Sequence, residues 1–247
     1  MDKFIDGIIL GHNQFFGINH MSSDKGIERE KLFSNVENVM SVIREAHSLG
    51  IRAISLNTHD KAKLIAAEIQ KDPILSRDLN IYILLPYMAK YVTMANEKGI
   101  VNMINDSIKG SSILDIAKIG ISGSFDLLNQ NYLKMIGTLI DIELLPFKDL
   151  KIRSILLHNS LTDLLLGLNF SSVLKYYSEY IKDKYNIRPG FCSLSSYKLM
   201  KMLKEIELEN QIVMAPINPI GFQMNPSKEK VEHELVNFNS DFIAMSV

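Results

Sequence analysis

Hydrophobic positions alternate between two patterns along the chain. Short, nearly continuous apolar runs, such as "IRAISLN" at 51–57 and "KIRSILLH" at 151–158, are separated by longer segments with helical spacing. At about 28–49 the apolar residues fall on one stripe, which consists of Leu32, Val36, Val39, Met40, Ile43 and Ala46. Continuous apolar runs are typical of parallel strands buried on both faces, so the pattern predicts repeated strand–helix units.

Seven strands can be predicted in this way. They are expected at 6–11, 51–57, 79–86, 151–158, 188–194, 211–218 and 241–247. Helices are expected at about 28–49, 60–70, 171–185, 195–207 and 226–237, the last with Asn225 and Pro226 as its N-cap and first-turn residues. For a chain of 247 residues this favours a (β/α)8 TIM barrel over a doubly wound sheet. We therefore expect one α/β barrel domain over 1–247.

Two parts of the chain depart from the strand–helix rhythm. The segment at about 87–150 contains expected helices near 94–108 and 126–145 and a connector, "GISGSF", at 120–125. An eighth strand either lies near 113–121 or is absent. The position of the fourth barrel strand therefore stays open. The chain stops on the apolar strand "FIAMSV", so we expect either a longer natural protein or an oligomer contact in place of a last helix.

The composition of the chain limits which binding partners and which cellular location are expected. The chain is 47% hydrophobic and 22% charged with a net charge of −1, which gives no electrostatic case for nucleic acid or a membrane surface. It has one cysteine, Cys192, no secretory signal and no apolar span of about 20 residues. These features favour a soluble cytoplasmic protein in which Cys192 is a buried structural thiol. A small-molecule substrate is the expected partner, and a homo-oligomer stays open.

Polar side chains follow the predicted strands at the end where a barrel carries its active site. They are His12, Asn13 and Gln14 after the first strand, Asn57, Thr58, His59 and Asp60 after the second, Tyr87, Lys90 and Tyr91 after the third, then His158 and Asn159, then Ser193, Ser195 and Ser196, and finally Asn218, Gln223 and Asn225. Each has a structural alternative, for example a bond to a neighbouring loop for His12 or a solvated position for His59 and Lys90. Phe15 and Phe16 are expected to pack around this polar group.

Several of these segments resemble the aldo-keto reductases over about two thirds of the chain. "ILLHN", "GFCSLSS", "VMAPINPIGF" and "FIAMSV" follow the family's order of strands, and "ILGHNQFFG" and "IREAHSLGIRAISLNT" resemble its first two. The resemblance implies that His158 orients or polarises a substrate carbonyl and that Lys90 tunes the acid. It also implies NADP as the cofactor, held by the region around and after the last strand.

This chain departs from the family's pattern at the second strand. Asn57 stands where the family has Asp, and the segment at 58–69 has no tyrosine. Since tyrosine is the family's proton donor, Tyr87 or Tyr91 from the third strand would have to replace it.

Three functions are therefore expected, in this order. The first is an aldo-keto reductase-like oxidoreductase acting on a small polar metabolite, with His158 and Lys90 as catalytic residues. Its substrate-binding residues would be His12, Asn13, Gln14, Asn57, His59, Asn159, Asn218 and Gln223. The second is a metal-assisted hydrolase, lyase or isomerase in which His12, His59 and His158, with Asp60, bind a divalent metal. The third is a non-enzymatic barrel that binds a ligand or partner. Both enzymatic hypotheses predict that His12 faces the same cavity as His158.

Overall fold

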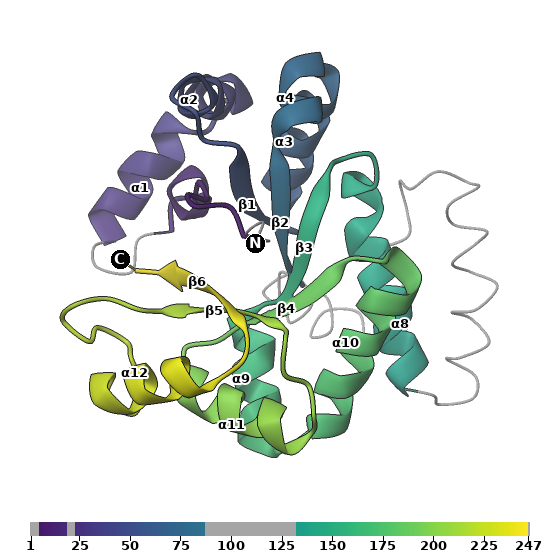
Figure 1. The fold of residues 1–247 in the computed structure, drawn as a ribbon. Helices are drawn as coiled ribbons and strands as arrows, with labels where there is room; N and C mark the ends of the chain where they lie inside the picture. Colours follow the sequence, from purple (N-terminus) through teal and green to yellow (C-terminus); the bar gives the residue numbers. More distant parts are fainter. Residues whose placement is uncertain (1–4, 19–22, 87–131, 247) are drawn as a thin grey trace. The chain divides into compact units, whose positions relative to one another are not determined.

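The computed structural model describes residues 5–18, 23–86 and 132–246 (Figure 1). Its strands are parallel and follow chain order in one sheet, β1-β2-β3-β4-β5-β6. The residues divide into two compact units. The first unit comprises Asp6–Leu84 and Leu144–Arg153, and the second comprises Leu85–Glu143 and Ser154–Val247, with the first few residues of the chain.

The expected closed (β/α)8 TIM barrel is wrong. Six strands, not eight, form in the part of the chain that the structure describes, and their sheet is open. The first expected strand, at 6–11, makes only an isolated bridge between Leu10 and Ile54. Gly7, Ile8 and Gly11 are exposed, so this run is not the doubly buried strand that its apolar character suggested. The alternative strand at 113–121 lies outside the described residues.

The first unit is built around β1 (Ala53–Asn57) and β2 (Asn80–Leu85), which pair in parallel from Ala53 opposite Asn80 onward. All five residues of β1 are buried, as expected for a strand covered on both faces. Its helices are α1 (Ser23–Leu32), α2 (Val36–Ser48), α3 (Asp60–Lys71) and α4 (Pro73–Asp78), with short 3-10 turns η1 (Asn13–Phe16) and η2 (Leu145–Phe147).

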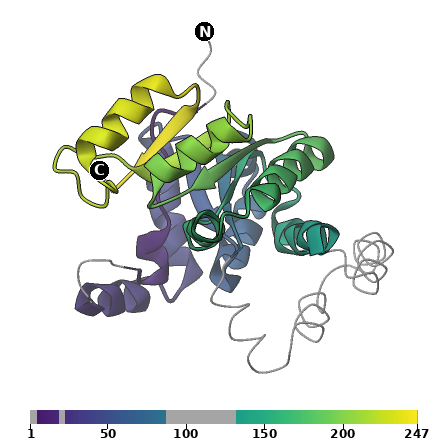
Figure 2. The same cartoon turned by 90° about the horizontal axis from the view of Figure 1, so that it is seen from below.

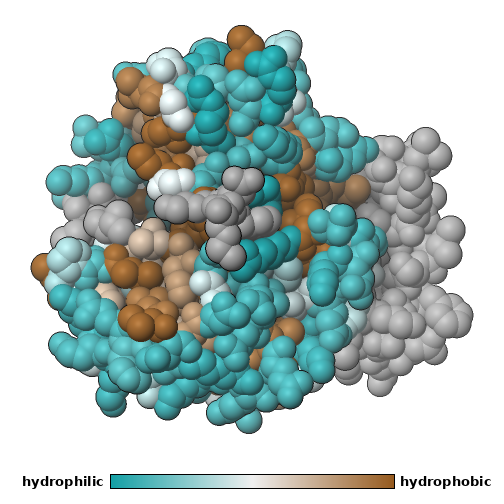
Figure 3. Space-filling model, viewed as in Figure 1, coloured by the Kyte–Doolittle hydropathy of each residue, from teal (hydrophilic) through white to brown (hydrophobic). Residues whose placement is uncertain are grey.

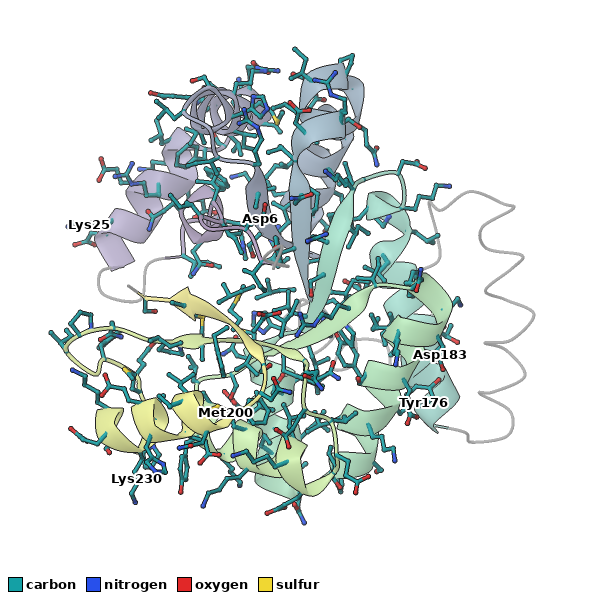
Figure 4. The ribbon with its side chains drawn as sticks, viewed as in Figure 1. Asp6, Lys25, Tyr176, Asp183, Met200 and Lys230 are labelled. Carbon is teal, nitrogen blue, oxygen red and sulfur yellow. The ribbon has the colours of Figure 1, made fainter. Side chains whose placement is uncertain are left out.

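Two features of the first unit differ from the sequence pattern or were absent from it. The single helix expected at about 28–49 is two helices, because Asn35 caps α2 by accepting a hydrogen bond from the Glu37 N–H at 3.0 Å. Asp6, labelled in Figure 4, anchors the chain before η1. Its carboxylate accepts hydrogen bonds from the Tyr82 hydroxyl at 2.7 Å and the Asn80 amide at 2.8 Å. Burial raises the pKa of Tyr82 to about 12.

The second unit contains the other four strands and five described helices. The strands are β3 (Ile152–Leu157), β4 (Arg188–Cys192), β5 (Ile212–Pro216) and β6 (Asp241–Met245). The helices are α8 (Tyr132–Leu144), α9 (Asn159–Leu168), α10 (Ser171–Tyr185), α11 (Ser196–Glu205) and α12 (Lys228–Asn237). Helices α9 and α10 pack on β4 and α11 packs on β5. Helices α11 and α12 lie side by side in Figures 1 and 2.

Close packing between β4 and β5 depends on one glycine. Gly190 lies opposite Ile212, and a Cβ atom at Gly190 would come within 2.9 Å of the Ile212 carbonyl oxygen. Cys192 is buried at the end of β4, as predicted. The expected N-cap pair of the last helix is wrong: Ser227, not Asn225, caps α12.

On the face shown in Figure 3, hydrophilic side chains dominate over α10, α11 and α12. Among the described helices, none has the length and apolar character required to cross a membrane.

Candidate functional site

In the first unit, His59 joins the end of β1 to the start of α3. It is the N-cap of α3, with φ −63° and ψ 151°, and its Nδ1 accepts a hydrogen bond from the Lys61 N–H at 3.0 Å. An imidazole whose Nδ1 is an acceptor carries its proton on Nε2 when neutral. Burial lowers the pKa of His59, which favours this neutral form.

The structure brings a second histidine to the same aromatic ring. The Phe16 ring centroid lies 5.2 Å from that of His59 and 5.4 Å from that of His12. His12 is buried, and its Nδ1 lies 3.4 Å from the Ser55 hydroxyl. Phe16, expected only to pack around the site, therefore contacts both imidazoles.

The turn that carries Phe16 is held from both sides. Phe15 is buried against Phe33, with ring centroids 5.2 Å apart, and its carbonyl oxygen accepts a hydrogen bond from Lys61 Nζ at 2.6 Å. Lys61 is half-buried, and burial lowers its pKa. The sequence analysis missed Lys61. The available signal was a lysine in the first turn of a helix, where the helix dipole disfavours a positive charge.

Asn57 is the last residue of β1 and is 2% exposed. Its Oδ1 accepts a hydrogen bond from the His59 N–H at 3.0 Å. Asn13 and Gln14, by contrast, are exposed on η1, so the structure does not bring their side chains into the buried group around His12. Asp60 is also exposed and pairs with Lys63 at 2.7 Å.

In the second unit, His158 repeats the arrangement of His59. It caps α9 with φ −64° and ψ 144°, and its Nδ1 accepts a hydrogen bond from the Ser160 N–H at 3.2 Å. Burial lowers the pKa of His158, while the charge of Asp163 opposes this shift. The neutral ring therefore presents Nε2–H as a donor, and no acceptor for Nε2 lies among the described residues.

Asp163 connects α9 to the end of β4. Its carboxylate accepts hydrogen bonds from the Ser193 hydroxyl at 2.5 Å and the Leu194 N–H at 3.1 Å. The Ser193 oxygen in turn accepts from the Ser195 N–H at 2.9 Å. The Leu194 carbonyl oxygen accepts from the Asn225 amide at 3.1 Å, which ties the segment after β4 to the segment that precedes α12. The sequence analysis did not single out Asp163.

The remaining candidates of the second unit have structural positions. The Asn218 side chain closes a turn, since it accepts from the Phe222 N–H and donates to the Phe222 carbonyl oxygen, both at 2.8 Å. Gln223 adopts a positive φ of 57° in the following turn. Asn159 is the first residue of α9, and its backbone hydrogen bonds to Cys192, whose pKa burial raises to about 12.

Two expectations are not resolved by these placements. Lys90, Tyr87 and Tyr91 lie outside the described residues. His12 and His158 belong to different units, so a common cavity stays a prediction. In the described part of the chain, no group of three or more His, Cys, Asp or Glu side chains is arranged to hold a metal ion.

Comparison with known proteins adds no family. Family models, curated proteins and solved structures were each searched with this chain, and none of the three comparisons found a match.

Proposed function

We propose that this protein is an enzyme acting on a small polar metabolite, with His158 donating a hydrogen bond from Nε2 to a substrate carbonyl oxygen. One observation carries the proposal. The Ser160 N–H occupies Nδ1 of His158, and Nε2–H has no acceptor in the described part of the chain.

Helix capping alone does not account for histidine at this position. Asparagine, aspartate and serine are the preferred N-cap residues. Histidine at this position instead places a half-buried imidazole at a strand end. His158 follows the carboxyl end of β3, which is where ligands bind in open parallel sheets. A neutral imidazole can polarise a carbonyl there without first losing a proton.

The resemblance to aldo-keto reductases makes carbonyl reduction the first reaction to test. The mechanism proposed here is limited to His158, because Lys90, Tyr87 and Tyr91 lie outside the described residues. The metal-assisted alternative has no supporting group of ligands among the described residues. A cytoplasmic location stays part of the proposal, since the single cysteine is buried and forms no disulfide within the chain.

A substitution at His158 separates capping from catalysis. His158→Asn keeps a side-chain acceptor for the Ser160 N–H but removes the Nε2–H donor. Consumption of NADPH would be measured with a panel of short aldehydes, ketones and keto acids, using His233→Asn on α12 as an exposed histidine control. We expect wild-type turnover in the control and a loss of roughly 100-fold or more in His158→Asn, as for removal of one oxyanion donor.

Two outcomes would contradict the proposal. Full activity in His158→Asn would show that the imidazole only caps α9. Binding of panel compounds without turnover, detected by ligand NMR on the wild type, would favour the non-enzymatic alternative.

A further inference from the structure

Three neighbouring strands of the second unit place sulfur-containing side chains on one face of the sheet. Cys192 on β4 is opposite Met214 on β5, and Met214 is opposite Ile243 on β6. Met245 lies two residues beyond Ile243 on the same strand. Because side chains alternate along a strand, Met245 shares the face that holds Cys192 and Met214. We call these three side chains the sulfur cluster.

The sulfur cluster faces away from α10. Phe191, the residue before Cys192, points to α10, where its ring centroid lies 5.5 Å from that of Tyr177. Cys192 therefore points to the opposite face, at the carboxyl end of β4. Cys192 and Met214 are buried, whereas Met245 is half-buried. Met245 is thus the most accessible member of the cluster, and a small ion could reach the buried thiol past it.

Two of these sulfur atoms lie at the distance that a shared metal ion requires. Cys192 Sγ is 3.9 Å from Met245 Sδ. With metal–sulfur bonds of about 2.3 Å, as in zinc thiolates, this separation corresponds to a sulfur–metal–sulfur angle of about 116°. That value lies between the tetrahedral angle of about 109° and the trigonal angle of about 120°. One ion could therefore bind both atoms without displacement of either strand.

The environment of the Cys192 sulfur suits a thiolate that is neutralised by a bound cation. Burial, together with the charge of Asp163, raises the pKa of Cys192 to about 12, while a hydrogen bond from the Asn159 N–H opposes this shift. The thiol therefore keeps its proton in the free protein. A coordinated cation that replaces the proton would neutralise the buried thiolate and keep the Asn159 hydrogen bond.

We propose that the sulfur cluster binds a soft monovalent cation, Cu(I), with Cys192 Sγ and Met245 Sδ as ligands and Met214, on the strand between them, as the third. Thiolate and thioether ligands select Cu(I), whereas zinc sites use thiolate, imidazole and carboxylate. Binding breaks the S–H bond of Cys192 and releases its proton to solvent, and copper stays in the same oxidation state. The site does not depend on activity at His158, so its failure would not bear on the enzyme proposed above.

Cu(I) itself is the probe, added to the full chain under anaerobic conditions with ascorbate as reductant. Affinity would be measured by competition with the coloured Cu(I) chelator bicinchoninate, and proton release by titration in weakly buffered solution. We expect one Cu(I) per chain, one proton released per ion, and a shift of the Met245 ε-methyl resonance in protein with 13C-labelled methionine. Zn(II) should bind at least about 100-fold more weakly than Cu(I), because thioethers are poor zinc ligands.

Variants then assign the ligands. Met245→Leu and Met214→Leu keep apolar side chains of similar volume but remove a thioether, so Cu(I) affinity should fall at least about tenfold in each, a difference of about 1.4 kcal/mol. Cys192→Ser should abolish binding, because a hydroxyl is not a soft ligand. Met202→Leu is the matched control and should leave the affinity unchanged, since Met202 is another buried methionine of this unit, on α11.

Several results would overturn the proposal. Unchanged Cu(I) affinity in either Met245→Leu or Met214→Leu would refute the three-ligand site and show that this methionine only fills space in the core. Tighter binding of Zn(II) than of Cu(I) would contradict the choice of a soft cation. Binding without proton release would exclude Cys192 as a thiolate ligand. If Cys192→Ser does not fold, the two methionine variants decide the question.

Discussion

The hydrogen bond from the Ser160 N–H to His158 Nδ1 leads to a quantitative prediction. Replacing His158 with alanine removes the acceptor at the start of α9, and removal of an N-cap typically costs 0.5–2 kcal/mol, often about 1 kcal/mol. Ser160 is exposed, so water can solvate its freed N–H, and the bond is long at 3.2 Å. We therefore expect His158→Ala to lower the free energy of unfolding by about 0.5–1 kcal/mol.

Asparagine tests whether this loss comes from the cap. Its side-chain oxygen can accept the same N–H, so His158→Asn should unfold within about 0.3 kcal/mol of the wild type, since asparagine is among the best N-cap residues. The two variants would be compared by urea unfolding at neutral pH. Native-state hydrogen exchange of the Ser160 amide gives a local measurement, because 1 kcal/mol corresponds to about a fivefold change in an equilibrium constant.

The reasoning would be refuted by equal destabilisation in the two variants. That result would mean that the ring of His158 contributes through packing and that the bond at Nδ1 does not stabilise α9. Unchanged exchange of the Ser160 amide in His158→Ala would refute it independently.

Four further predictions concern other parts of the structure. Burial lowers the pKa values of His59 and His158, so their stabilising contribution is complete above the unfolded pKa of about 6.5 and is lost as the pH falls through the folded pKa values. The urea midpoint of unfolding should drop over that pH interval, and it should drop less in the double variant His59→Asn/His158→Asn. An equal drop in the wild type and the double variant would contradict the assignment. Gly190→Ala should destabilise the protein by about 1–3 kcal/mol in urea unfolding, because its Cβ atom would meet backbone atoms of β5, and a neutral effect would show that the strands separate easily. Asp141 is buried and accepts hydrogen bonds from Tyr180, Tyr185 and Lys184, so Asp141→Asn should cost about 2 kcal/mol in the same assay, while exposed Asp183→Asn should cost almost nothing. Cys192, with a pKa raised to about 12, should react with iodoacetamide far more slowly in the native protein than in urea, and rapid native alkylation would contradict its burial.

Strand prediction succeeded where burial on two faces left a distinct pattern. The runs containing β1 to β6 were recognised because nearly every residue in them is apolar, and the structure buries most of β1, β2, β4 and β5 completely. The same criterion failed at 6–11, where Ile8, Ile9 and Leu10 follow one another but flanking glycines and an exposed Ile8 leave only one bridge. An apolar run alone does not determine whether a neighbouring strand exists on both sides.

Helix prediction failed at boundaries set by individual polar residues. The stripe of apolar residues at about 28–49 continues from Leu32 to Val36 at helical spacing, so hydrophobic periodicity could not detect the break between α1 and α2. The N-cap bond of Asn35 decides it. Helix α9 was not expected at all, since Leu164 and Leu168 are exposed and obscure the buried face formed by Leu165 and Leu166.

The candidate site shows a similar division. His12, Asn57, His59 and His158 were chosen because polar side chains follow apolar strands, and the structure places all four at buried or half-buried positions. Sequence spacing could not reveal that Phe16 contacts both His12 and His59, or that Lys61 holds the turn containing Phe15. The contacts of Phe16 with His59 and of Lys61 with Phe15 join residues more than 40 positions apart along the chain.

The sequence by itself determined the α/β class, the parallel strands and the positions at which polar chemistry follows them, because burial on both faces demands continuous apolar runs and strand ends return the chain to water. Only the tertiary structure decided that the sheet is open, that Asn218 closes a turn, and that His59 and His158 are anchored through Nδ1. The reason is physical: sheet closure, ring orientation and the pairing of each buried donor depend on atoms that the fold brings together from distant parts of the chain.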